Sequence, residues 1–496
     1  MASNAPSFYI NTNRAFSPVR RYIWILTLLI GVGGQFWPLI GLLVPVIMAA
    51  LILTSLFKGK YWCGNFCPHG SFFDNLLLPI SRHGRIPGFL RSLPVVAIVL
   101  VFFLFNMGRR FWHVYAEIEP GAIWEQMGLI FSTTYLVVLI VGGLLAVAVS
   151  SRTWCQFCPM GTIQHIFYKL GKAIGLAQKT DHRVTIEHPE LCHSCGKCAR
   201  VCPMQLYPYL NFSENHMLED EECIRCNTCV KNCPAGILHL TTPQEAEKIK
   251  RNASLDGFAE ADYYEAQIKE IKEIKEDVRQ YTFELLNSAQ MIFTPGQFVL
   301  VEIDSNIKMF RAYSISASQD DHTEITITVK KLPDGYGTNL LFENFREGDL
   351  VTLKGPMGKD IRIDPTGKEL MFISNGIGVT PFVSAVQSFF DYRHYNFDGK
   401  VTLLYGARYE EDLVYDDYFE YMARQNENLD YYKVLSRPRT DKYPKGYVTD
   451  VIKELSPSPE TRVYICGTSA MANQAIEQLV AKGVPENNIF YEDFGL

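Results

Sequence analysis

The spacing of eight cysteines constrains this chain more than any other feature of its sequence. They lie between Cys192 and Cys233 and repeat the pattern C-x2-C-x2-C-x3-C-P, first as CHSCGKCARVCP and then as CIRCNTCVKNCP. In this pattern the first three thiolates of one run and the fourth of the other run hold one cubane, so the segment predicts two [4Fe–4S] clusters in a ferredoxin-like α+β fold. A zinc site fits poorly, because zinc sites rarely pair eight cysteines with this proline-ended spacing. The predicted ligand sets are Cys192, Cys195, Cys198 and Cys233 for one cluster, and Cys223, Cys226, Cys229 and Cys202 for the other.

Four further cysteines lie in two similar phrases. Cys63 and Cys67 belong to YWCGNFCPHG, and Cys155 and Cys158 belong to TWCQFCPMG. Each phrase follows a long apolar run and ends in Cys-Pro-x-Gly, which turns the chain sharply. Disulfides are not expected, because the chain is neither small nor recognisably secreted and its cysteines are regularly spaced.

The apolar runs predict a helical membrane domain of about four spans. No charged residue occurs in 22–57, 92–108 or 126–151, and one span needs about 20 apolar residues. We read the first run as two short spans with a break near Gly31 to Pro38. The alternative is one long kinked helix, which gives three spans and places the two cysteine phrases on opposite faces.

Basic residues predict the orientation. With four spans, the basic residues that flank the runs all face the cytoplasm, as the positive-inside rule prefers; they are Arg14, Arg20, Arg21, Lys58, Lys60, Arg82, Arg85, Arg91, Arg152, Lys169 and Lys172. Arg109 and Arg110 oppose this orientation. The expected location is the inner (cytoplasmic) membrane, multi-pass, with the ferredoxin-like segment and the carboxyl-terminal half in the cytoplasm. The net charge of −6 gives no reason to expect a nucleic-acid partner.

The carboxyl-terminal half has a different pattern of charged and apolar residues. A charged, helix-prone stretch from about Thr242 to Glu265 reads as a linker, and alternating segments such as IKEIKEDVRQYTFEL and EITITVKKL read as half-buried strands. Six motifs then follow in order, and the order is more informative than any one of them. They are PGQFV (295–299), RAYSIS (311–316), DGYGTNLL (334–341), GDLVTLKGPMG (348–358), NGIGVTP (375–381) and YICGTSAM (464–471), before the chain ends in FYEDFGL.

This half resembles the ferredoxin–NADP reductase family of flavoproteins. The resemblance implies an antiparallel β-barrel that binds FAD (FMN less readily) and an α/β domain that binds NADH or NADPH. It implies that Arg311 pairs with a flavin phosphate, that Tyr313 packs on the isoalloxazine and that Ser314 hydrogen-bonds near its reactive nitrogen, so that Ser314 and Cys466 act at the hydride-transfer site. The implied cofactor-binding residues are Arg311, Ala312, Tyr313, Ser314, Gly335, Gly337, Thr338, Gly376, Gly378, Thr380, Pro381, Cys466 and Gly467.

The choice between NADH and NADPH stays open in the sequence. Ser436 and Arg437, with Arg439 and Lys442 nearby, could grip a 2′-phosphate because arginine suits bidentate phosphate binding. The same SRPR stretch also reads as a solvated loop.

The amino-terminal part, about residues 15–240, resembles membrane polyferredoxins of nitrate and nitrous-oxide respiration and of cytochrome oxidase assembly. Those proteins carry a repeated C-x3-C-P phrase beside membrane helices; Cys63 and Cys67 match it, whereas Cys155 and Cys158 have C-x2-C-P. Because soft thiolates select iron–sulfur clusters or soft metals, we expect these four cysteines to hold a third iron–sulfur centre together. A single iron or zinc ion, or free thiols, are the alternatives. His69 and His165 lie near the phrases and read as interfacial residues rather than ligands.

The sequence thus predicts five parts: 1–175, the membrane domain; 176–241, the ferredoxin-like domain; 242–265, the linker; 266–363, the flavin barrel; and 364–496, the NAD(P)-binding domain. Together they predict a membrane-bound NAD(P)H oxidoreductase that moves electrons through flavin and iron–sulfur clusters. Its partners would be NAD(P)H, the lipid bilayer and a redox partner such as ferredoxin, a quinone or a membrane protein subunit. The alternatives are a metal- or thiol-reducing assembly factor and an accessory subunit of a larger respiratory complex.

Overall fold

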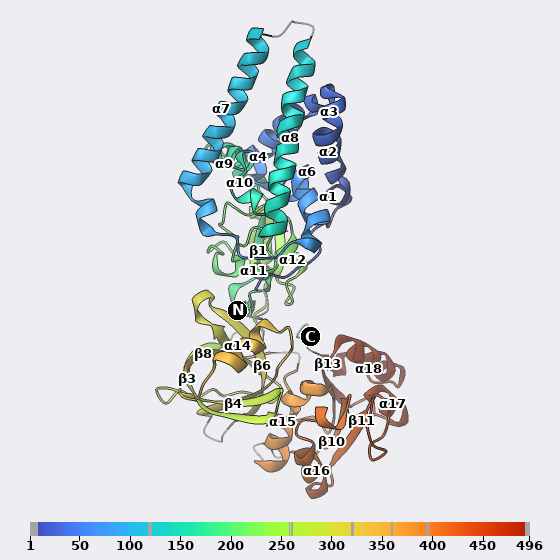
Figure 1. Ribbon diagram of the computed structural model, residues 1–496. Helices are drawn as coiled ribbons and strands as arrows, with labels where there is room; N and C mark the ends of the chain where they lie inside the picture. The colour runs from blue at the N-terminus through green and yellow to red at the C-terminus, as the bar shows by residue number, and fades with distance from the viewer. Residues whose placement is uncertain are drawn as a thin grey trace. The chain divides into compact units, whose positions relative to one another are not determined.

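The computed structural model describes residues 8–117, 122–256, 258, 261–318, 322–358, 361–392, 395 and 397–491 (Figure 1). The chain divides into two compact units. One is formed by Ser7–Cys192 with Gly196–Ser254, and the other by Leu255–Leu496 with His193–Cys195. The predicted membrane and ferredoxin-like parts therefore belong almost entirely to one unit, and the flavin and nicotinamide domains to the other. The predicted domain boundaries themselves stay predictions.

The first unit is built mainly of helices, and three of them are long and apolar enough to cross a membrane among the described residues: Pro38–Lys58, Leu93–Ala116 and Ile123–Ala148. Two long helices, α7 and α8, stand out in Figure 1. The helical elements are α1 (Pro18–Tyr22), α2 (Trp24–Leu28), η1 (Leu29–Gly33), α3 (Gly34–Phe36), η2 (Pro38–Leu42), α4 (Leu43–Lys58), α5 (Tyr61–Asn65), α6 (Pro68–Phe72), η3 (Phe73–Leu77), η4 (Leu78–Ile80), η5 (Gly88–Arg91), α7 (Leu93–Glu117), α8 (Ile123–Ala148), η7 (Trp154–Gln156), α9 (Pro159–Ala173) and α10 (Leu176–Thr180).

The prediction of four spans is supported for three. The first apolar run breaks at Trp37 (φ −125°, ψ 81°), as expected near Pro38, because the residue before proline is pushed out of the helical region. The stretch before the break is made of short helical pieces with a π-helical turn over Leu29–Gly33. It is not among the three described helices that are long and apolar enough to cross a membrane. The alternative of one long kinked helix is wrong about the helix, since the chain leaves the helical conformation at Trp37, although its count of three spans agrees with the three candidates. Its consequence, cysteine phrases on opposite faces, is also wrong, because two candidate spans lie between the phrases and all four cysteines line one cavity.

Small residues fasten this first run to α8. A Cβ added to Gly41 would lie 1.9 Å from the carbonyl oxygen of Gly128, and one added to Gly128 would lie 2.0 Å from the carbonyl oxygen of Pro38. The two backbones are therefore in direct contact, a type of packing that glycine makes possible between membrane helices.

The ferredoxin-like segment shows its internal repeat in the backbone. Left-handed conformations recur at equivalent positions of the two cysteine runs: Ser194 and Arg225 precede the second cysteine, and Gly196 and Asn227 follow it. A short helix follows in each run. The elements of this segment are β1 (Arg183–Ile186), η8 (Pro189–Leu191), α11 (Lys197–Arg200), η9 (Pro208–Leu210), α12 (Thr228–Lys231) and β2 (Leu238–Thr241), with β1 and β2 antiparallel.

The predicted linker helix is shorter than expected. Helix α13 (Pro243–Asn252) starts at a capping box made by Thr242 and Glu245, and the first barrel strand already begins at Asp262. The barrel is closed, with strand order β3-β4-β7-β6-β5-β8 and antiparallel pairing throughout. Its elements are β3 (Asp262–Lys275), β4 (Val278–Leu285), β5 (Phe298–Asp304), η10 (Ser305–Ile307), β6 (Met309–Ser318), β7 (Glu324–Lys330), α14 (Tyr336–Asn344) and β8 (Leu350–Met357).

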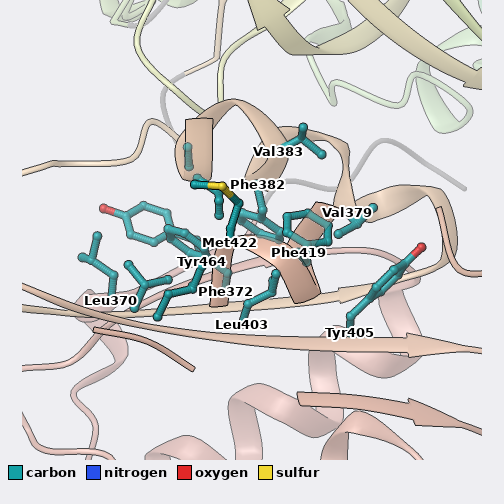
Figure 2. Close-up of a cluster of buried hydrophobic side chains, with 14 of the residues drawn as sticks. Leu370, Phe372, Val379, Phe382, Val383, Leu403, Tyr405, Phe419, Met422 and Tyr464 are labelled. Atoms are coloured by element: carbon teal, nitrogen blue, oxygen red, sulfur yellow. The ribbon is translucent and has the colours of Figure 1, made fainter. Parts of the chain in front are cut away.

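The last part of the chain is an α/β domain with a five-stranded parallel sheet in the order β11-β10-β9-β12-β13. Figure 2 shows part of the buried cluster on one face, where Phe382 and Val383 of the helix after β9 lie among Phe372, Leu403 and Phe419. The last five residues of FYEDFGL lie outside the described residues. The elements are β9 (Glu369–Asn375), η11 (Gly376–Val379), α15 (Thr380–Val386), η12 (Gln387–Asp391), β10 (Lys400–Ala407), η13 (Glu410–Asp412), α16 (Asp416–Gln425), β11 (Leu429–Leu435), α17 (Val448–Glu454), β12 (Arg462–Cys466), α18 (Ser469–Ala481), η14 (Glu486–Asn488) and β13 (Ile489–Tyr491).

Candidate functional site

Arg311 and the glycine-rich turn meet at one end of the barrel. Gly335 is the N-cap of α14, and a Cβ added to Gly337 would lie 3.0 Å from Nε of Arg311. Thr338 holds the turn, since its Oγ1 accepts from the N–H of Leu332 at 3.1 Å. A guanidinium beside a helix N-terminus suits a phosphate group, so these residues fit the flavin phosphate that the sequence assigned to them. In this structure Arg311 donates to the carbonyl oxygens of Phe310 (2.9 Å) and of Cys195 (2.5 Å), which belongs to the same compact unit.

The rest of the RAYS motif lies along β6. Tyr313 pairs in register with Val299 of β5, and Ser314 pairs with Phe298. Helix α15, which begins at Thr380, packs against β6. The flavin motif and the nicotinamide loop are thus on neighbouring elements, the arrangement that hydride transfer between two bound cofactors requires.

The two nicotinamide motifs meet at the carboxyl ends of β9 and β12. A Cβ on Gly378 would lie 2.5 Å from the carbonyl oxygen of Cys466, and the Asn375 side chain bonds both the N–H and the hydroxyl of Thr468, at 3.1 and 3.0 Å. The chain runs from β9 to β10 on one side, while β12 lies on the other side. This is the point in a parallel sheet where dinucleotides bind.

The other predicted nicotinamide-binding residues lie at the same end of the sheet, and their roles stay predictions. Gly376 has a φ of +55°, Thr380 donates to the carbonyl of Ile377 at 3.1 Å, and Cys466 is buried. Gly467 leaves no room for a side chain, because an added Cβ would lie 2.3 Å from Oδ1 of Asn375.

The SRPR stretch follows β11, and part of it is bonded to neighbouring acidic residues. The guanidinium of Arg439 pairs with Glu411 at 2.6 Å, and the backbone N–H of Arg439 donates to Glu410. The Ser436 and Arg437 backbones are tied to Ala407 and Arg408 at the end of β10. The choice between NADH and NADPH stays open.

In the ferredoxin-like segment, Cys202 lies with the second cysteine run, as the crossed ligand assignment expects. Burial, and then the neighbouring thiol of Cys226, raise the pKa of Cys202 to about 12. The pKa of Cys229 is raised by burial and then by Cys223 and Cys226. The assignment of the eight cysteines as ligands stays a prediction, and the donor set fits two clusters.

The two opening phrases fold alike despite their different spacing. In each, the first cysteine lies on a short helical turn, and the second, Cys67 or Cys158, is the N-cap of a helix that starts with proline. The turn around Cys63 is α-helical and the turn around Cys155 is a 3₁₀ turn. Because a 3₁₀ turn takes fewer residues than an α turn, the shorter C-x2-C spacing reaches the same place.

All four cysteines of these phrases line one cavity of about 440 Å³. Their sulfurs accept hydrogen bonds, among them Cys67 from the N–H of Gly70 (3.4 Å), Cys155 from Arg152 (3.4 Å) and Cys63 from Gln164 (3.0 Å). Burial is the largest cause that raises the pKa of each thiol, to about 12 for Cys67 and Cys155. A metal deprotonates a coordinating thiol outright, so these buried sulfurs fit a metal-bound role better than a free thiolate.

A buried charge network lies directly behind the phrases, and the sequence did not indicate it. Asp74 pairs with Arg14 (3.3 Å), Arg20 (2.5 Å) and Arg152 (2.7 Å), and all four side chains are at most 6% exposed. Arg20 also donates to the carbonyl oxygens of Cys67 and Gly70. Three arginines and one carboxylate leave an excess of two positive charges among the described members of this network.

The excess positive charge bears on which group the four cysteines bind. Burying uncompensated charge is costly, so the network calls for an anionic neighbour. An oxidised cubane with four thiolate ligands has a charge of about −2, since its net charge includes the thiolates. Neutral thiols would leave the arginines uncompensated.

The four-cysteine site is also in contact with the second cysteine run. Met204, Leu206 and Ile224 form one buried layer, against which pack Cys63 and Cys155 as well as Cys202, Cys223 and Cys226. Gly64 touches the run through its backbone, because an added Cβ would lie 2.0 Å from the carbonyl oxygen of Ile224 and 3.1 Å from the amide nitrogen of Cys226. One layer of side chains therefore separates the two thiol sets.

Ion pairs lie beside the same contact. Lys60, beside the first phrase, pairs with Glu222 at 2.5 Å, and Arg225 pairs with Asp181 at 2.9 Å. His165 lies 3.7 Å from Glu221. His69 lines the cavity, and its Nε2 lies 3.1 Å from the carbonyl oxygen of Tyr135. Burial lowers the pKa of His69 to about 4, so its ring is neutral.

Four protein-family models match separate parts of the chain. The "4Fe-4S binding domain" matches residues 40–87 and 133–177, which contain the two phrases, and the "4Fe-4S dicluster domain" matches 191–238. The "Oxidoreductase FAD-binding domain" matches 265–360 and the "Oxidoreductase NAD-binding domain" matches 372–477. The cofactor types expected from the sequence are thereby confirmed, with iron–sulfur domains in the amino-terminal half and FAD- and NAD-binding domains in the other.

Curated relatives match about half of the chain. The toluate 1,2-dioxygenase electron transfer component of Pseudomonas putida is 28% identical over 47% of this chain and 67% of its own length. The reductase component of the glycine betaine monooxygenase of Pseudomonas aeruginosa is 28% identical over 45% of this chain and 63% of its own length. The chain spans about two thirds of the length of these relatives.

Among solved structures, the cytochrome P450 reductase of Amycolatopsis is similar with 23% identity and a TM-score of 0.43, over 47% of this chain and 70% of that one. The ferredoxin reductase of a carbazole 1,9a-dioxygenase has 24% identity, the same coverage and a TM-score of 0.42.

Proposed function

We propose that this chain, an NAD(P)H-dependent flavin and iron–sulfur oxidoreductase, is inserted in the cytoplasmic membrane and passes electrons from the nicotinamide to an acceptor there. The observation that carries the proposal is the layer of Met204, Leu206 and Ile224 between the four-cysteine site and the second cysteine run. If both sites hold redox centres, this contact places them close enough for electron transfer. The electron path then extends from the ferredoxin-like segment towards the long apolar helices.

The chain's own residues support the first steps. Gly378 and the Cys466–Gly467 turn bring the backbones into close contact at the carboxyl ends of β9 and β12, where a dinucleotide would bind. Arg311 with the α14 N-terminus provides the anchor for a flavin phosphate. When bound, the flavin converts a two-electron hydride donor into single electrons that iron–sulfur clusters accept.

The proposal also assigns Cys63, Cys67, Cys155 and Cys158 to one third iron–sulfur centre. Its support is their shared cavity, the matching turns of the two phrases and the excess of positive charge around Asp74. This third centre would pass electrons from the ferredoxin clusters towards the long apolar helices.

The orientation rests on fewer charges than the sequence suggested. Arg14, Arg20 and Arg152 are buried in the Asp74 network, so they do not report on lipid headgroups. The other flanking basic residues, such as Lys58, Arg82 and Lys169, still favour a cytoplasmic position of the cysteine phrases under the positive-inside rule.

The deciding experiment measures iron, acid-labile sulfide and flavin in protein purified anaerobically in detergent. Two ferredoxin clusters predict roughly 8 irons per chain, and a third cubane predicts roughly 12. The Cys63→Ser variant should lose about 4 irons, whereas an exposed change such as Glu247→Gln should lose none. A wild-type value near 8 with complete ferredoxin signals would refute the third centre, and failure of NADH or NADPH to reduce the clusters would refute the electron path.

A further inference from the structure

The cavity above the four cysteines is larger than their cluster needs. Its floor is formed by the cysteine phrases, and its walls are formed by α4, α7 and α8. Along α7 the lining residues run from Val99 to Arg110, which corresponds to about 16 Å at 1.5 Å per residue. A cubane bound to the four sulfurs would occupy one end and leave the rest of this space between the helices.

The walls are apolar, and one face of α7 supplies much of them. The lining residues of this helix are Val99, Phe102, Phe103, Asn106, Met107 and Arg110, which recur at helical spacing, while α4 and α8 add side chains such as Met48, Phe131 and Val138. The cavity volume of about 440 Å³ falls within the range of small-molecule sites, which are mostly apolar with a few polar groups.

A few polar groups interrupt this apolar surface. Asn106 and Arg110 lie on the α7 wall, and Thr134 and His69 lie on the side of α8 and the first phrase. His69 is held by Tyr135, whose ring centroid is 4.0 Å away. Polar residues on a membrane helix are costly and usually mark a functional position. Arg110, which opposed the predicted orientation, is thus accounted for as a lining residue.

We propose that this cavity binds a quinone-class carrier, with its ring towards the four-cysteine end and its apolar tail between α4, α7 and α8. The proposal rests on the function proposed above, since the third centre would be the electron donor. The site favours this occupant because the space is continuous with the four-cysteine site and apolar along its length, with a few polar side chains in its walls. In this structure the Asn106 amide donates to the carbonyl of Phe102 and the Thr134 hydroxyl to that of Ile130, so binding a ring oxygen would exchange these partners.

The reaction balances with the reductant already identified. One NADH and one proton reduce one quinone to a hydroquinone and yield NAD⁺; two electrons pass to the ring, and its two oxygens gain two protons. One of these protons derives from the hydride donor and the other from solvent.

The test uses full-length protein in detergent and a ubiquinone analogue with a decyl tail. Binding is followed by tryptophan fluorescence, because Trp62 and Trp154 line the cavity. Met107→Trp should fill the cavity and raise the Kd for the analogue at least tenfold, and Val138→Trp should do the same from α8. The matched controls are Leu104→Trp and Ile140→Trp on the same helices, at positions that are 53% and 54% exposed.

The rate of NADH-dependent reduction of the analogue is divided by the rate with ferricyanide in the same preparation. A tenfold drop of this ratio in both cavity variants, with neither control changed more than twofold, is the expected result. If NADH reduces all iron–sulfur centres but the analogue does not bind, or binds all variants alike, the quinone site is refuted while the electron path stands. A co-purified phospholipid that the analogue does not displace would also refute it. If NADH fails to reduce the centres, the proposed function fails first.

Discussion

Replacing Asp74 with asparagine tests how much the buried charge network contributes to the stability of the protein. The carboxylate accepts two bonds from Arg152, at 3.0 and 2.7 Å, and pairs with Arg20 and Arg14. Asparagine keeps the size of the side chain and one acceptor oxygen but removes the charge. Three buried guanidinium groups then remain without their carboxylate, in a region that also contacts Cys67 and Cys155.

The expected cost is about 3–5 kcal/mol, the range seen when one partner of a buried ion pair is removed. For a domain of about 150–250 residues, 1 kcal/mol corresponds to roughly 2–4 °C in Tm. Asp74→Asn should therefore lower the Tm of the first unit by roughly 6–20 °C. The exposed pair between Glu247 and Arg251 is a suitable comparison, because exposed pairs contribute about 0–1 kcal/mol.

The assay is thermal unfolding of anaerobically purified protein, followed by loss of the iron–sulfur absorbance and by circular dichroism. Glu247→Gln should change the Tm by less than about 2 °C, since its partner is exposed. A shift of that size in Asp74→Asn as well, with full iron content, would mean that the three arginines are compensated in another way, and the charge argument for the third centre would fall.

Three other changes test separate steps. Arg14→Met should destabilise the iron-loaded protein but stabilise the iron-free protein, because the excess positive charge is compensated in the first and repulsive in the second; equal signs in two melting curves would contradict this. Gly64→Val forces a side chain against the Ile224 carbonyl and should slow NADH-driven reduction of the third centre in freeze-quench spectra, while reduction of the two ferredoxin clusters keeps its rate. Gly378→Val should lower kcat/KM for NADH at least tenfold with unchanged flavin content, since the new side chain meets the Cys466 carbonyl; an unchanged kcat/KM would place the nicotinamide elsewhere.

The cysteine runs and the flavin and nicotinamide motifs were predictable because local spacing defines them. The eight cysteines form two contiguous runs whose spacing is itself the signal. The motif NGIGVTP likewise lies within one short stretch, at the junction between a strand and a helix. The break near Pro38 was equally local, whereas the number of spans was not: composition does not reveal that three glycines and a π-helical turn divide the stretch before Trp37.

The Asp74 network and the Gly64 contact could not be predicted in this way. Arg14, Asp74 and Arg152 are far apart in the sequence, and each reads as an ordinary charge beside an apolar run. Only packing of the amino-terminal segment against the two phrases shows that Arg14 and Arg152 share one carboxylate. Gly64 likewise reads as a turn residue until the second cysteine run is seen against it.

The Asp74 network also sets an order for biogenesis. Its members come from both ends of the helical region, so the pocket for the third centre is incomplete until the ribosome has passed Arg152 and the second phrase has emerged. Under the proposed membrane insertion, Cys63 and Cys67 would remain uncoordinated thiols while α7 and α8 enter the membrane. Under the proposed function, cluster delivery to this site would have to follow the insertion of α7 and α8, whereas the eight ferredoxin cysteines all lie within one short stretch of chain, from Cys192 to Cys233.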